Sequence, residues 1–395
     1  MRVLYLTDSL SDLDGVGRYA VCLIAALERR RPDLEVEVLL SRKHRPSSAE
    51  VPEHWKVSIG LPPDYFFRMS PVRFWGSLVV ATGRVARAAR SADLVHAIKD
   101  YPHSLAGVVG ARLAGVPCLA TAHGTYSVQP LLSPRHERLA RFTYKRLAGL
   151  VAVSRHTRDR LAELLGGEGP ARVRVIPNAV SVDPYAAAPE IGPRPWHGHP
   201  FTLSIGEIKE RKGHHLALEA WTRVAPRHPE LHHYVVGKAS GDAYEAALRE
   251  TVRRAGLEAR VHFLGNVSES EKVDLLRRAR TFLHTPVTSA DGGFEGFGIV
   301  YLEASASGTP PIGTLGCGAE DAIVDGETGL LVPPTAEAVT AALDRLLADE
   351  ALRSRLAAGG LSHARRSSWE ANAESVLRLY DEVLGSQGGP PGPAT

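Results

Sequence analysis

Short runs of apolar and β-branched residues alternate with longer stretches of helical periodicity along the whole chain. The strands expected in the first half are residues 3–6, 36–40, 94–97, 118–122, 150–153 and 173–176. Those expected in the second half are residues 201–205, 233–236, 261–264, 281–283, 311–313 and 330–332. Such alternation is typical of βαβ units and predicts an α/β fold built on parallel sheets. Because 395 residues exceed what one hydrophobic core usually holds, two domains are expected.

A proline-rich stretch marks the expected boundary between the domains. Residues 184–200 contain several prolines and little periodicity, which predicts a linker. The first domain is then residues 1–183 and the second is residues 201–368. A last helical pattern covers residues 369–385, and the glycine- and proline-rich residues 386–395 predict a disordered tail.

The net charge of +3 is unevenly distributed. Residues 1–189 hold 26 Lys and Arg against 17 Asp and Glu, and the remaining residues hold 21 against 27. The basic first half indicates an anionic partner. Nucleic acid is not expected as that partner, because no basic-aromatic or helix-turn-helix pattern accompanies the positive charge.

Cysteines and apolar runs bear on the compartment. Cys22, Cys118 and Cys317 are far apart in the sequence and predict neither a disulfide framework nor a metal site. The apolar run at residues 3–6 is too short for the core of a secretory signal. No stretch approaches the ~20 apolar residues of a membrane span, so we expect a cytoplasmic protein.

Residues 294–304 read FEGFGIVYLEA and contain two carboxylates, Glu295 and Glu303. A turn that opens a helix separates them. At ~3.6 residues per turn, Glu303 is expected about two turns into that helix, so the two side chains can flank an extended ligand. Ionised carboxylates only accept hydrogen bonds, which suits the hydroxyls of a sugar and a ribose. The alternative is a turn before a buried helix, with two glutamates that share no role.

The turn between the two carboxylates is suited to a phosphate. Gly296 and Gly298 let the backbone approach a ligand without obstruction by side chains. A helix that starts near Phe297 presents the amides of Ile299 and Val300, together with the positive end of its dipole.

This stretch resembles the E-x7-E signature of retaining GT-B glycosyltransferases, especially glycosyltransferase family 4. In that family the first Glu contacts the transferred sugar and the second contacts the ribose of the nucleotide, which implies these roles for Glu295 and Glu303. The resemblance also implies the GT-B fold, in which two Rossmann-like domains with parallel sheets face each other across a cleft. The final helix, residues 369–385, is expected to cross back onto the first domain.

Residues 14–20, DGVGRYA, formally match the dinucleotide fingerprint G-x-G-x-x-G/A. That fingerprint requires its glycines directly after the first strand, whereas here a long loop intervenes. Arg42 after the second strand keeps an NADP site open as an alternative. Family 4 enzymes commonly carry G-G-x-G-R-Y here, in a loop that faces the donor phosphates. The resemblance implies that role for Gly15 and Gly17, with Asp14 in place of the family's first glycine.

Residues 12–14 also spell D-x-D, the metal-binding pair of GT-A enzymes. Solvated aspartates in a turn are the simpler interpretation. The sequence shows no other carboxylate or histidine cluster with the spacing of metal ligands, so no metal is predicted.

Residues 206–213, GEIKERKG, resemble the family's G-R-L-x-x-x-K-G, in which Arg and Lys clamp the donor diphosphate. Lys212 matches, but Glu207 occupies the arginine position. A carboxylate 4 Å from a phosphate would cost about 4 kcal/mol at an effective dielectric constant near 20. Glu207 must therefore turn away, or be neutralised by Arg211 or another cation. Without the resemblance, the segment reads as a charged loop before a helix.

His123, in the sequence ATAHG at residues 120–124, ends a predicted strand. The family often has T-x-H-G here, with the histidine near the transferred sugar, and the alternative is a histidine that only packs. His96 and Asn178 also match family positions, either as site residues or as braces for loops.

Basic residues cluster within residues 135–146, where five Lys and Arg stand among apolar side chains. Membrane-active members of the family use basic surfaces of this domain to reach lipid acceptors. A peripheral membrane contact is one interpretation of this stretch, and a solvated helix face is the other.

Together these features predict a retaining, metal-independent glycosyltransferase that uses a nucleotide-diphosphate sugar and no cofactor. The acceptor would be a sugar, a lipid or a small molecule. Glu295 would orient the sugar, and Lys212, Arg211 and backbone amides would stabilise the departing diphosphate during front-face attack. The alternatives are an NADP-dependent oxidoreductase and a GT-B protein that binds nucleotide sugars but has lost transfer.

Overall fold

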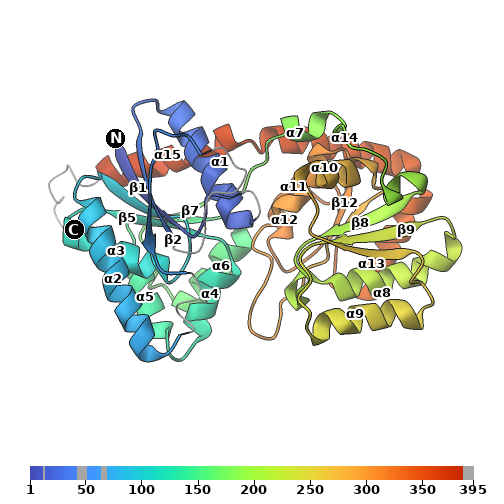
Figure 1. Cartoon of the computed structure of the whole chain (residues 1–395), viewed down its shortest axis with the longest axis horizontal. Coiled ribbons are helices and arrows are strands. Elements are labelled where there is room, and N and C mark those ends of the chain that lie inside the picture. The colour runs from blue at the N-terminus through green and yellow to red at the C-terminus, as the bar shows by residue number, and fades with distance from the viewer. Residues whose placement is uncertain (12–13, 42–50, 64–68, 386–395) are drawn as a thin grey trace. The chain divides into compact units, whose positions relative to one another are not determined.

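The computed structural model describes residues 1–11, 14–41, 51–63 and 69–385 and divides into two compact units. The first unit is Met1–Asn178 together with the segment that begins at Trp369, and the second is Ala179–Ser368. Each unit holds one parallel sheet with helices on both of its faces (Figure 1). The predicted α/β fold with two Rossmann-like domains is confirmed.

The sheet of the first unit has seven strands in the order β3-β2-β1-β4-β5-β6-β7. They are β1 (Arg2–Thr7), β2 (Glu35–Ser41), β3 (Lys56–Leu61), β4 (Leu94–Ala97), β5 (Cys118–Ala122), β6 (Gly149–Ala152) and β7 (Val173–Val175). Strand β3 is absent from the strands predicted above; it lies at the edge of the sheet and is exposed over much of its length. A short edge strand lacks the continuous apolar run that identifies a strand buried on both faces.

Helices follow most of these strands and cover both faces of the sheet. They are α1 (Gly15–Arg30), α2 (Pro71–Ala89), α3 (His103–Ala114), α4 (Thr125–Leu132), α5 (Glu137–Arg146), α6 (Arg155–Leu165) and α15 (Trp369–Gly385). The last of these, α15, packs against α1 and β6 of the first unit. Its Tyr380 is fully buried, with the hydroxyl 2.6 Å from Nδ1 of His96 in β4. Arg29 of α1 pairs with Glu370 at 2.8 Å.

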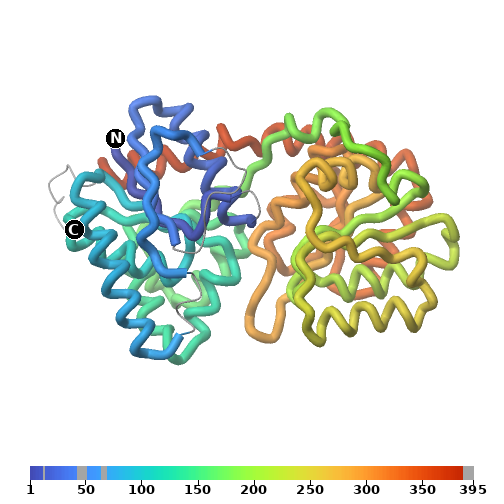
Figure 2. Tube along the Cα trace, in the orientation of Figure 1, coloured from blue at the N-terminus to red at the C-terminus, as the bar shows by residue number. Residues whose placement is uncertain are grey.

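The chain passes between the units twice, after Asn178 and after Ser368, as the colours of Figure 2 show. Within each unit, a hydrogen bond joins the two segments that lead to the other unit. In the first unit, Asn372 donates its side-chain amide to the carbonyl of Pro177 at 2.7 Å. In the second unit, the backbone N–H of Val180 donates to the carbonyl of Ser367 at 2.9 Å.

The sheet of the second unit has six strands in the order β10-β9-β8-β11-β12-β13. They are β8 (Phe201–Ile205), β9 (His232–Val236), β10 (Val261–Gly265), β11 (Phe282–Leu283), β12 (Pro311–Thr314) and β13 (Leu330–Val332). The α-helices are α7 (Asp183–Ala186), α8 (His214–Val224), α9 (Ala243–Arg254), α10 (Glu269–Arg278), α11 (Ile299–Ala306), α12 (Ala319–Ala322), α13 (Ala336–Ala348) and α14 (Glu350–Arg366). Three 3₁₀ turns are η2 (Pro195–Gly198), η3 (Glu210–Lys212) and η4 (Ala225–Arg227). A hydrophobic core cluster of this unit contains the fully buried Trp221 of α8.

The structure differs from the linker predicted over residues 184–200. This segment belongs to the second unit and contains two buried aromatic side chains, Tyr185 and Trp196. The indole N–H of Trp196 donates to a carboxylate oxygen of Asp274 in α10 at 2.7 Å. Two buried aromatic side chains fix this segment, and its sequence has no periodicity that would predict their packing.

Two further expectations concern apolar spans and the last residues of the chain. Within the described ranges, no helix combines the length and the apolar character that crossing a membrane requires. The tail predicted for residues 386–395 lies outside the described residues.

Candidate active site

The segment from Phe294 to Glu303 forms a loop followed by α11. Gly298 is the N-cap of this helix and has a φ of +82°, a conformation that favours glycine. A Cβ at this position would lie 2.6 Å from the ring of Tyr301. The helix therefore begins at Ile299, two residues later than predicted, and Glu303 lies about one turn into it rather than two.

The first turn of α11 presents backbone donors. The N–H groups at the start of a helix have no acceptor within the helix, and here they belong to the part-exposed Ile299 and Val300. The preceding loop is held by the N–H of Gly318, which donates to the carbonyl of Glu295 at 2.8 Å. A Cβ on Gly318 would meet the carbonyl oxygen of Gly296 at 2.0 Å, so the two backbones can approach only because Gly318 is glycine.

Glu295 is the centre of a buried polar cluster at the carboxyl ends of β8 and β11. One carboxylate oxygen lies 2.5 Å from Nζ of Lys212 and 3.0 Å from Nε2 of His284. Burial opposes ionisation of Glu295, but the charge of Lys212 and the bond from His284 outweigh it and hold the pKa of the carboxyl well below its usual range. Glu295 is therefore an ionised acceptor beside an ammonium group.

His284 is a site residue that sequence analysis missed. It directly follows β11, and burial lowers the pKa of its imidazole, so the neutral ring donates through Nε2 to Glu295. Its Nδ1 is buried and lacks a hydrogen-bond partner among the described residues. The available signal was the position of a histidine at the carboxyl end of a predicted strand, where parallel sheets bind ligands.

Glu207 is neutralised, and of the cations that the sequence left open, Arg211 or another, the hydrogen-bonded one is Lys209. The carboxylate of Glu207 accepts a bond from Nζ of Lys209 at 2.7 Å. Burial tends to raise the pKa of Glu207, and the bond from Lys209 with the charges of Arg211 and Lys212 lowers it. The loop thus keeps a positive balance around Lys212.

Glu303 is paired with a lysine of its own. It is buried, and one oxygen lies 3.0 Å from Nζ of Lys272 in α10. The same ammonium lies 2.7 Å from Glu269. The structure therefore brings Glu295, Lys212 and His284 together and gives Glu303 a separate ionic partner.

In the first unit, His123 directly follows β5. Its Nε2 lies 2.8 Å from the carbonyl oxygen of Ile98, and its ring meets that of Tyr19 edge to face at 4.8 Å between centroids. Because a carbonyl only accepts, Nε2 carries the proton and Nδ1 is left as an acceptor. Burial lowers the pKa of His123, so the ring is neutral near pH 7.

Four charged or titratable residues that sequence analysis missed lie at the carboxyl ends of β1 and β4. Nζ of Lys99 is 3.3 Å from a carboxylate oxygen of Asp8, and Nδ1 of His103 is 3.5 Å from the other. The hydroxyl of Ser127 donates to Oδ1 of Asp100, while Oδ2 of Asp100 has no hydrogen-bond partner within the described part of the chain. Asp8, Lys99 and Asp100 lie within three residues of the ends of two predicted strands, a position that could have identified them, and His103 opens the helix that follows.

The glycine-rich loop separates into two roles. Asp14 caps α1, since its Oδ1 accepts from the N–H of Gly17 at 2.7 Å and its Oδ2 from the hydroxyl of Ser9 at 2.6 Å. A Cβ on Gly17 would lie 2.4 Å from that hydroxyl oxygen, whereas a Cβ on Gly15 would meet open space. Gly17 is thus needed for packing, and Gly15 leaves the start of α1 uncovered. Arg42 and residues 12–13 lie outside the described residues.

His96 braces the first unit. Its Nδ1 lies 2.6 Å from the hydroxyl of Tyr380 and its Nε2 2.8 Å from that of Thr121. Burial, followed by the charge of His123, lowers the pKa of His96 to about 3. The other matching position, Asn178, is buried and ends the first segment of this unit.

The basic stretch at residues 135–146 is largely satisfied locally. Arg141 pairs with Glu137 at 2.9 Å, and Lys145 lies 3.8 Å from Glu168. Arg135 donates to the carbonyl of Met69 at 2.7 Å. These contacts favour the interpretation of α5 as a solvated helix face.

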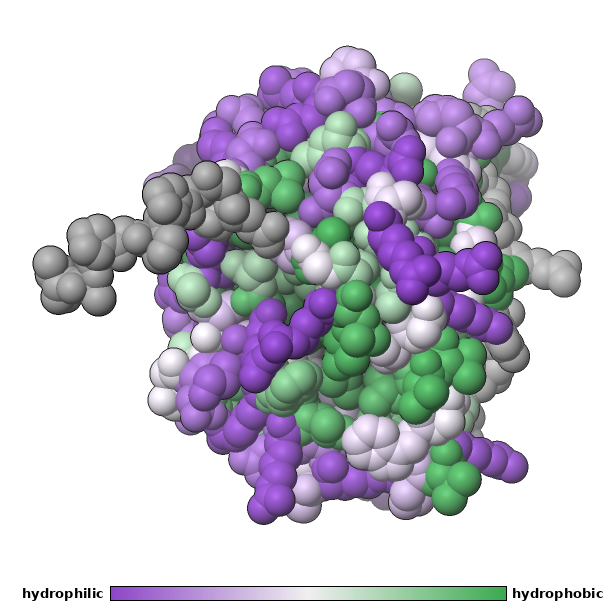
Figure 3. Space-filling view, turned by 90° about the vertical axis from the view of Figure 1, so that its left-hand side faces the viewer, coloured by the Kyte–Doolittle hydropathy of each residue, from purple (hydrophilic) through white to green (hydrophobic). Residues whose placement is uncertain are grey.

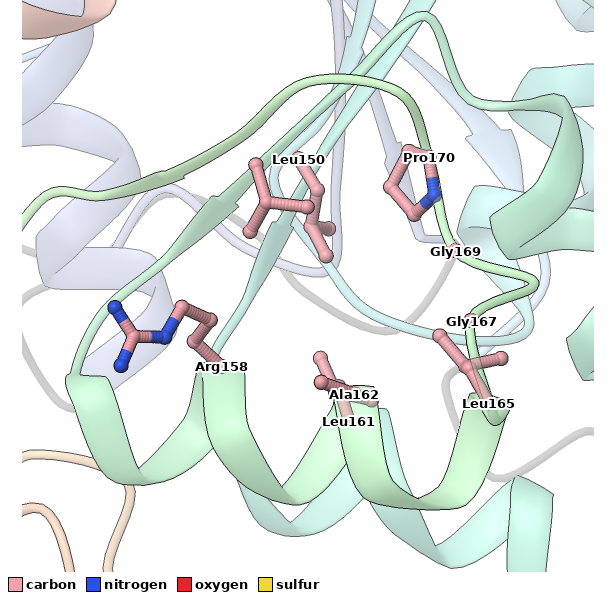
Figure 4. Close-up of a pocket in the computed structure, with 9 residues that line it drawn as sticks. Leu150, Arg158, Leu161, Ala162, Leu165, Gly167, Gly169 and Pro170 are labelled. Atoms are coloured by element: carbon pink, nitrogen blue, oxygen red, sulfur yellow. The ribbon is translucent and has the colours of Figure 1, made fainter.

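A pocket of about 190 Å³ lies elsewhere, beside α6 in the first unit (Figure 4). Its lining is mostly apolar, with Leu150 and Leu161 facing the space and Arg158 at one end. Because no predicted site residue lines it, the pocket is not part of the candidate active site.

Comparisons with known proteins agree with this geometry. Residues 13–184 match the family model described as Glycosyltransferase Family 4, and residues 193–362 match that of Glycosyl transferases group 1. A phosphatidyl-myo-inositol mannosyltransferase of Mycobacterium tuberculosis is 31% identical over 341 residues, which cover 82% of this chain and 85% of the relative. A D-inositol 3-phosphate glycosyltransferase of Corynebacterium glutamicum is 27% identical over 401 residues, covering 95% and 93%.

Two solved structures show the same fold. Anabaena HepE, in complex with UDP and glucose, has a TM-score of 0.75 and 20% identity, and the match covers 97% of this chain and 100% of that one. Sucrose-phosphate synthase of Thermosynechococcus elongatus has a TM-score of 0.75 and 22% identity, covering 98% and 100%.

Proposed function

We propose how this chain, which belongs to glycosyltransferase family 4 and is a glycosyltransferase, carries out transfer. The proposed donor is a nucleotide-diphosphate sugar. The sugar is transferred with retention of its anomeric configuration and without a metal ion. The observation that carries the proposal is the contact between Lys212 and Glu295. A carboxylate and an ammonium group 2.5 Å apart suit the junction of a sugar and a diphosphate. The carboxylate accepts from sugar hydroxyls, and the ammonium faces phosphate oxygens.

In this proposal the donor breaks at the bond between the sugar and the diphosphate. Negative charge develops on the departing diphosphate, and Lys212, Arg211 and the amides of Ile299 and Val300 stabilise it. The acceptor oxygen attacks from the same face, and the leaving phosphate takes the acceptor's proton. Glu295 orients the sugar and forms no covalent intermediate.

Glu303 and His123 are assigned supporting contacts. Glu303 would accept from the ribose hydroxyls through the carboxylate that pairs with Lys272. His123 would accept a hydrogen bond from a substrate hydroxyl through Nδ1, because its Nε2 is already committed to Ile98. Gly15 would leave the start of α1 open for an anionic group.

For the acceptor we propose a polyhydroxylated ring that carries a phosphate, free or as a lipid headgroup. The named relatives act on phosphatidyl-myo-inositol and inositol 3-phosphate. Asp8 and Asp100 supply hydroxyl-accepting oxygens, and Lys99 supplies a positive charge. The positive balance of the first half of the chain supports an anionic acceptor.

A lipid acceptor would require contact with a membrane surface, and α2 is better suited to it than α5. Its outward side exposes Val72, Trp75, Val79 and Val80 to between 50% and 84%. Exposed arginines, including Arg73, lie on the same helix. Figure 3 shows hydrophobic side chains gathered on this side of the first unit, with hydrophilic ones at their border. Such a surface suits the interface of an anionic bilayer.

The decisive experiment screens nucleotide sugars by thermal unfolding and then tests the stabilising donor for turnover with inositol phosphates. One nucleotide sugar is expected to raise the unfolding temperature and to be consumed. Turnover is expected to persist in EDTA, because the positive charge comes from side chains and amides. Stabilisation by NADPH alone would support the oxidoreductase instead, and tight donor binding without turnover would support a binding protein.

A further inference from the structure

Three histidines of the second unit converge at the amino ends of neighbouring strands, whereas Lys212 and His284 follow the carboxyl ends of β8 and β11. His199 precedes β8, His232 is the first residue of β9, and His262 is the second residue of β10. The parallel register pairs Phe201 with His232 and Tyr234 with His262. Because side chains alternate along a strand, this register places the three imidazoles on one face of the sheet.

The imidazoles are in direct contact with one another. Nδ1 of His232 lies 2.9 Å from Nε2 of His262, and the rings of His199 and His232 stack with centroids 3.5 Å apart. One nitrogen from each of the three lies within 4.8 Å of the others. Two nitrogens bound at ~2.0–2.1 Å to one metal stand ~2.9–3.4 Å apart, depending on the angle between the bonds. His232 and His262 already have this spacing, and a rotation of the His199 ring would complete the set.

The three rings are neutral at neutral pH. Burial lowers the pKa of each, and the neighbouring His199 and His262 help to lower the pKa of His232 to about 4. Arg260 is the nearby cation, and its guanidinium is engaged by the carbonyl oxygens of Ala225 and His228. Neutral imidazoles offer lone pairs, which are the form that binds a metal.

We propose that His199, His232 and His262 form a binding site for a divalent transition-metal ion, with Zn²⁺ as its best match. Imidazole nitrogens without hard oxygen ligands suit zinc, copper or nickel and do not suit magnesium or calcium. The hydroxyl of Tyr234 lies 2.7 Å from Nε2 of His199. When that nitrogen donates its proton to the hydroxyl, Nδ1 is left as the ligand, an outer contact typical of metal-bound histidines.

Binding of the metal moves one proton from one ring nitrogen to another and releases no proton from the three histidines. The bond between His232 and His262 holds one proton between the two rings, whereas the metal needs a lone pair from both. That proton moves, through water, to the far nitrogen of its own ring. Three protein ligands and one water complete a tetrahedral zinc. The bound ion would join β8, β9 and β10 at their amino ends and take no part in sugar transfer.

The test uses full-length protein without an affinity tag, stripped of metal with EDTA and then dialysed. Isothermal titration with ZnCl₂ is expected to show one Zn²⁺ per chain, and thermal unfolding should shift upward. His232→Gln and His262→Gln are each expected to weaken Zn²⁺ binding at least tenfold. His228→Gln is the matched control, because His228 lies in the same unit but outside the cluster, and its Zn²⁺ affinity should equal that of the natural chain.

His232 and His262 lie within strands, so their variants are checked for folding by circular dichroism. His199→Asn, outside the strands, gives a third variant with the same expected loss. Absence of Zn²⁺ binding to the natural chain would overturn the proposal, as would unchanged affinity in all three folded variants. Donor turnover in His232→Gln should match the natural chain, and its loss in a folded variant would contradict a site separate from transfer.

Discussion

At the scale of single residues, two glutamates with the same chemistry have different neighbours. Glu295 shares its oxygen with Lys212 and His284, whereas Glu303 faces Lys272. The sequence spacing predicted both carboxylates, but it gave no information on their partners, which come from distant parts of the chain. The roles of the two carboxylates are therefore tested with Glu→Gln variants, which keep the size of the side chain and remove its charge.

Glu303→Gln is expected to weaken free nucleotide diphosphate and nucleotide sugar alike by about ten- to a hundredfold, because a charged hydrogen bond contributes roughly 1.5–3 kcal/mol. Glu295→Gln should leave nucleotide affinity near that of the natural chain while turnover collapses, since the donor contacts assigned to Glu295 are those to the sugar and Lys212 still faces the diphosphate. Isothermal titration beside turnover measurements decides between these outcomes. Equal loss of nucleotide affinity in both variants would contradict the assigned roles.

Glu207 shows what a local motif can and cannot predict. The need for a neutralising cation followed from the sequence, but the choice of Lys209 depends on the turn that brings the two side chains to 2.7 Å. Lys209→Met is expected to raise the donor KM about fivefold, because a half-exposed ion pair contributes at most ~1 kcal/mol. The double variant Glu207→Gln with Lys209→Met should restore the KM. A KM unchanged by Lys209→Met would mean that Glu207 points away from the donor.

At the scale of elements, the alternation of apolar strands with helical patterns predicted the two sheets well. The features that it did not predict depend on a helix cap, an exposed edge strand and a buried aromatic side chain. The start of α11 depends on the left-handed Gly298, and sequence periodicity does not report backbone conformation. The edge strand β3 (Lys56–Leu61) is too exposed to show an apolar run. Trp196 fixes a proline-rich segment through one indole bond to Asp274 that no local pattern predicts.

From the exposed apolar side of α2 we predict that this helix binds anionic membranes. Trp75→Ser combined with Val79→Ser should reduce sedimentation with vesicles of anionic phospholipid severalfold, because both side chains are half or more exposed on the same helix. Val324→Ser, which changes an exposed apolar side chain of the second unit, is the control and should leave sedimentation unchanged. Equal binding of all three proteins to vesicles would remove α2 as the membrane contact, and a change in oligomeric state alone would indicate a second copy as its partner.

At the scale of the whole molecule, buried histidines link stability to pH. Burial lowers the pKa of His96 and His233 to about 3 and that of His214 to about 4. Below about pH 6.5 these imidazoles bind protons in the unfolded chain but stay neutral in the folded chain. The free energy of unfolding therefore falls with decreasing pH. Each such group contributes up to about 1.4 kcal/mol per pH unit. The ionised Glu295 adds to the loss as the pH falls through about 4.5, where half of the unfolded carboxyl groups are protonated.

Denaturant unfolding followed by tryptophan fluorescence should therefore show a loss of stability between pH 6.5 and pH 4.5. His233→Gln is expected to make this dependence shallower in the second unit. A flat profile over that range would contradict neutral burial of these imidazoles.

The return of α15 to the first unit has a consequence for the order in which a ribosome makes this protein. The second unit is one uninterrupted segment, Ala179–Ser368, and all of its contacts are available as soon as it emerges. The first unit is translated earlier but completed later. His96 has its hydrogen bond to Tyr380, and α1 has its packing against α15, only after α15 has been synthesised. The nascent chain must therefore keep an unfinished apolar surface through the synthesis of an entire domain. The second unit is complete first, and the first unit is completed only after α15 has left the exit tunnel.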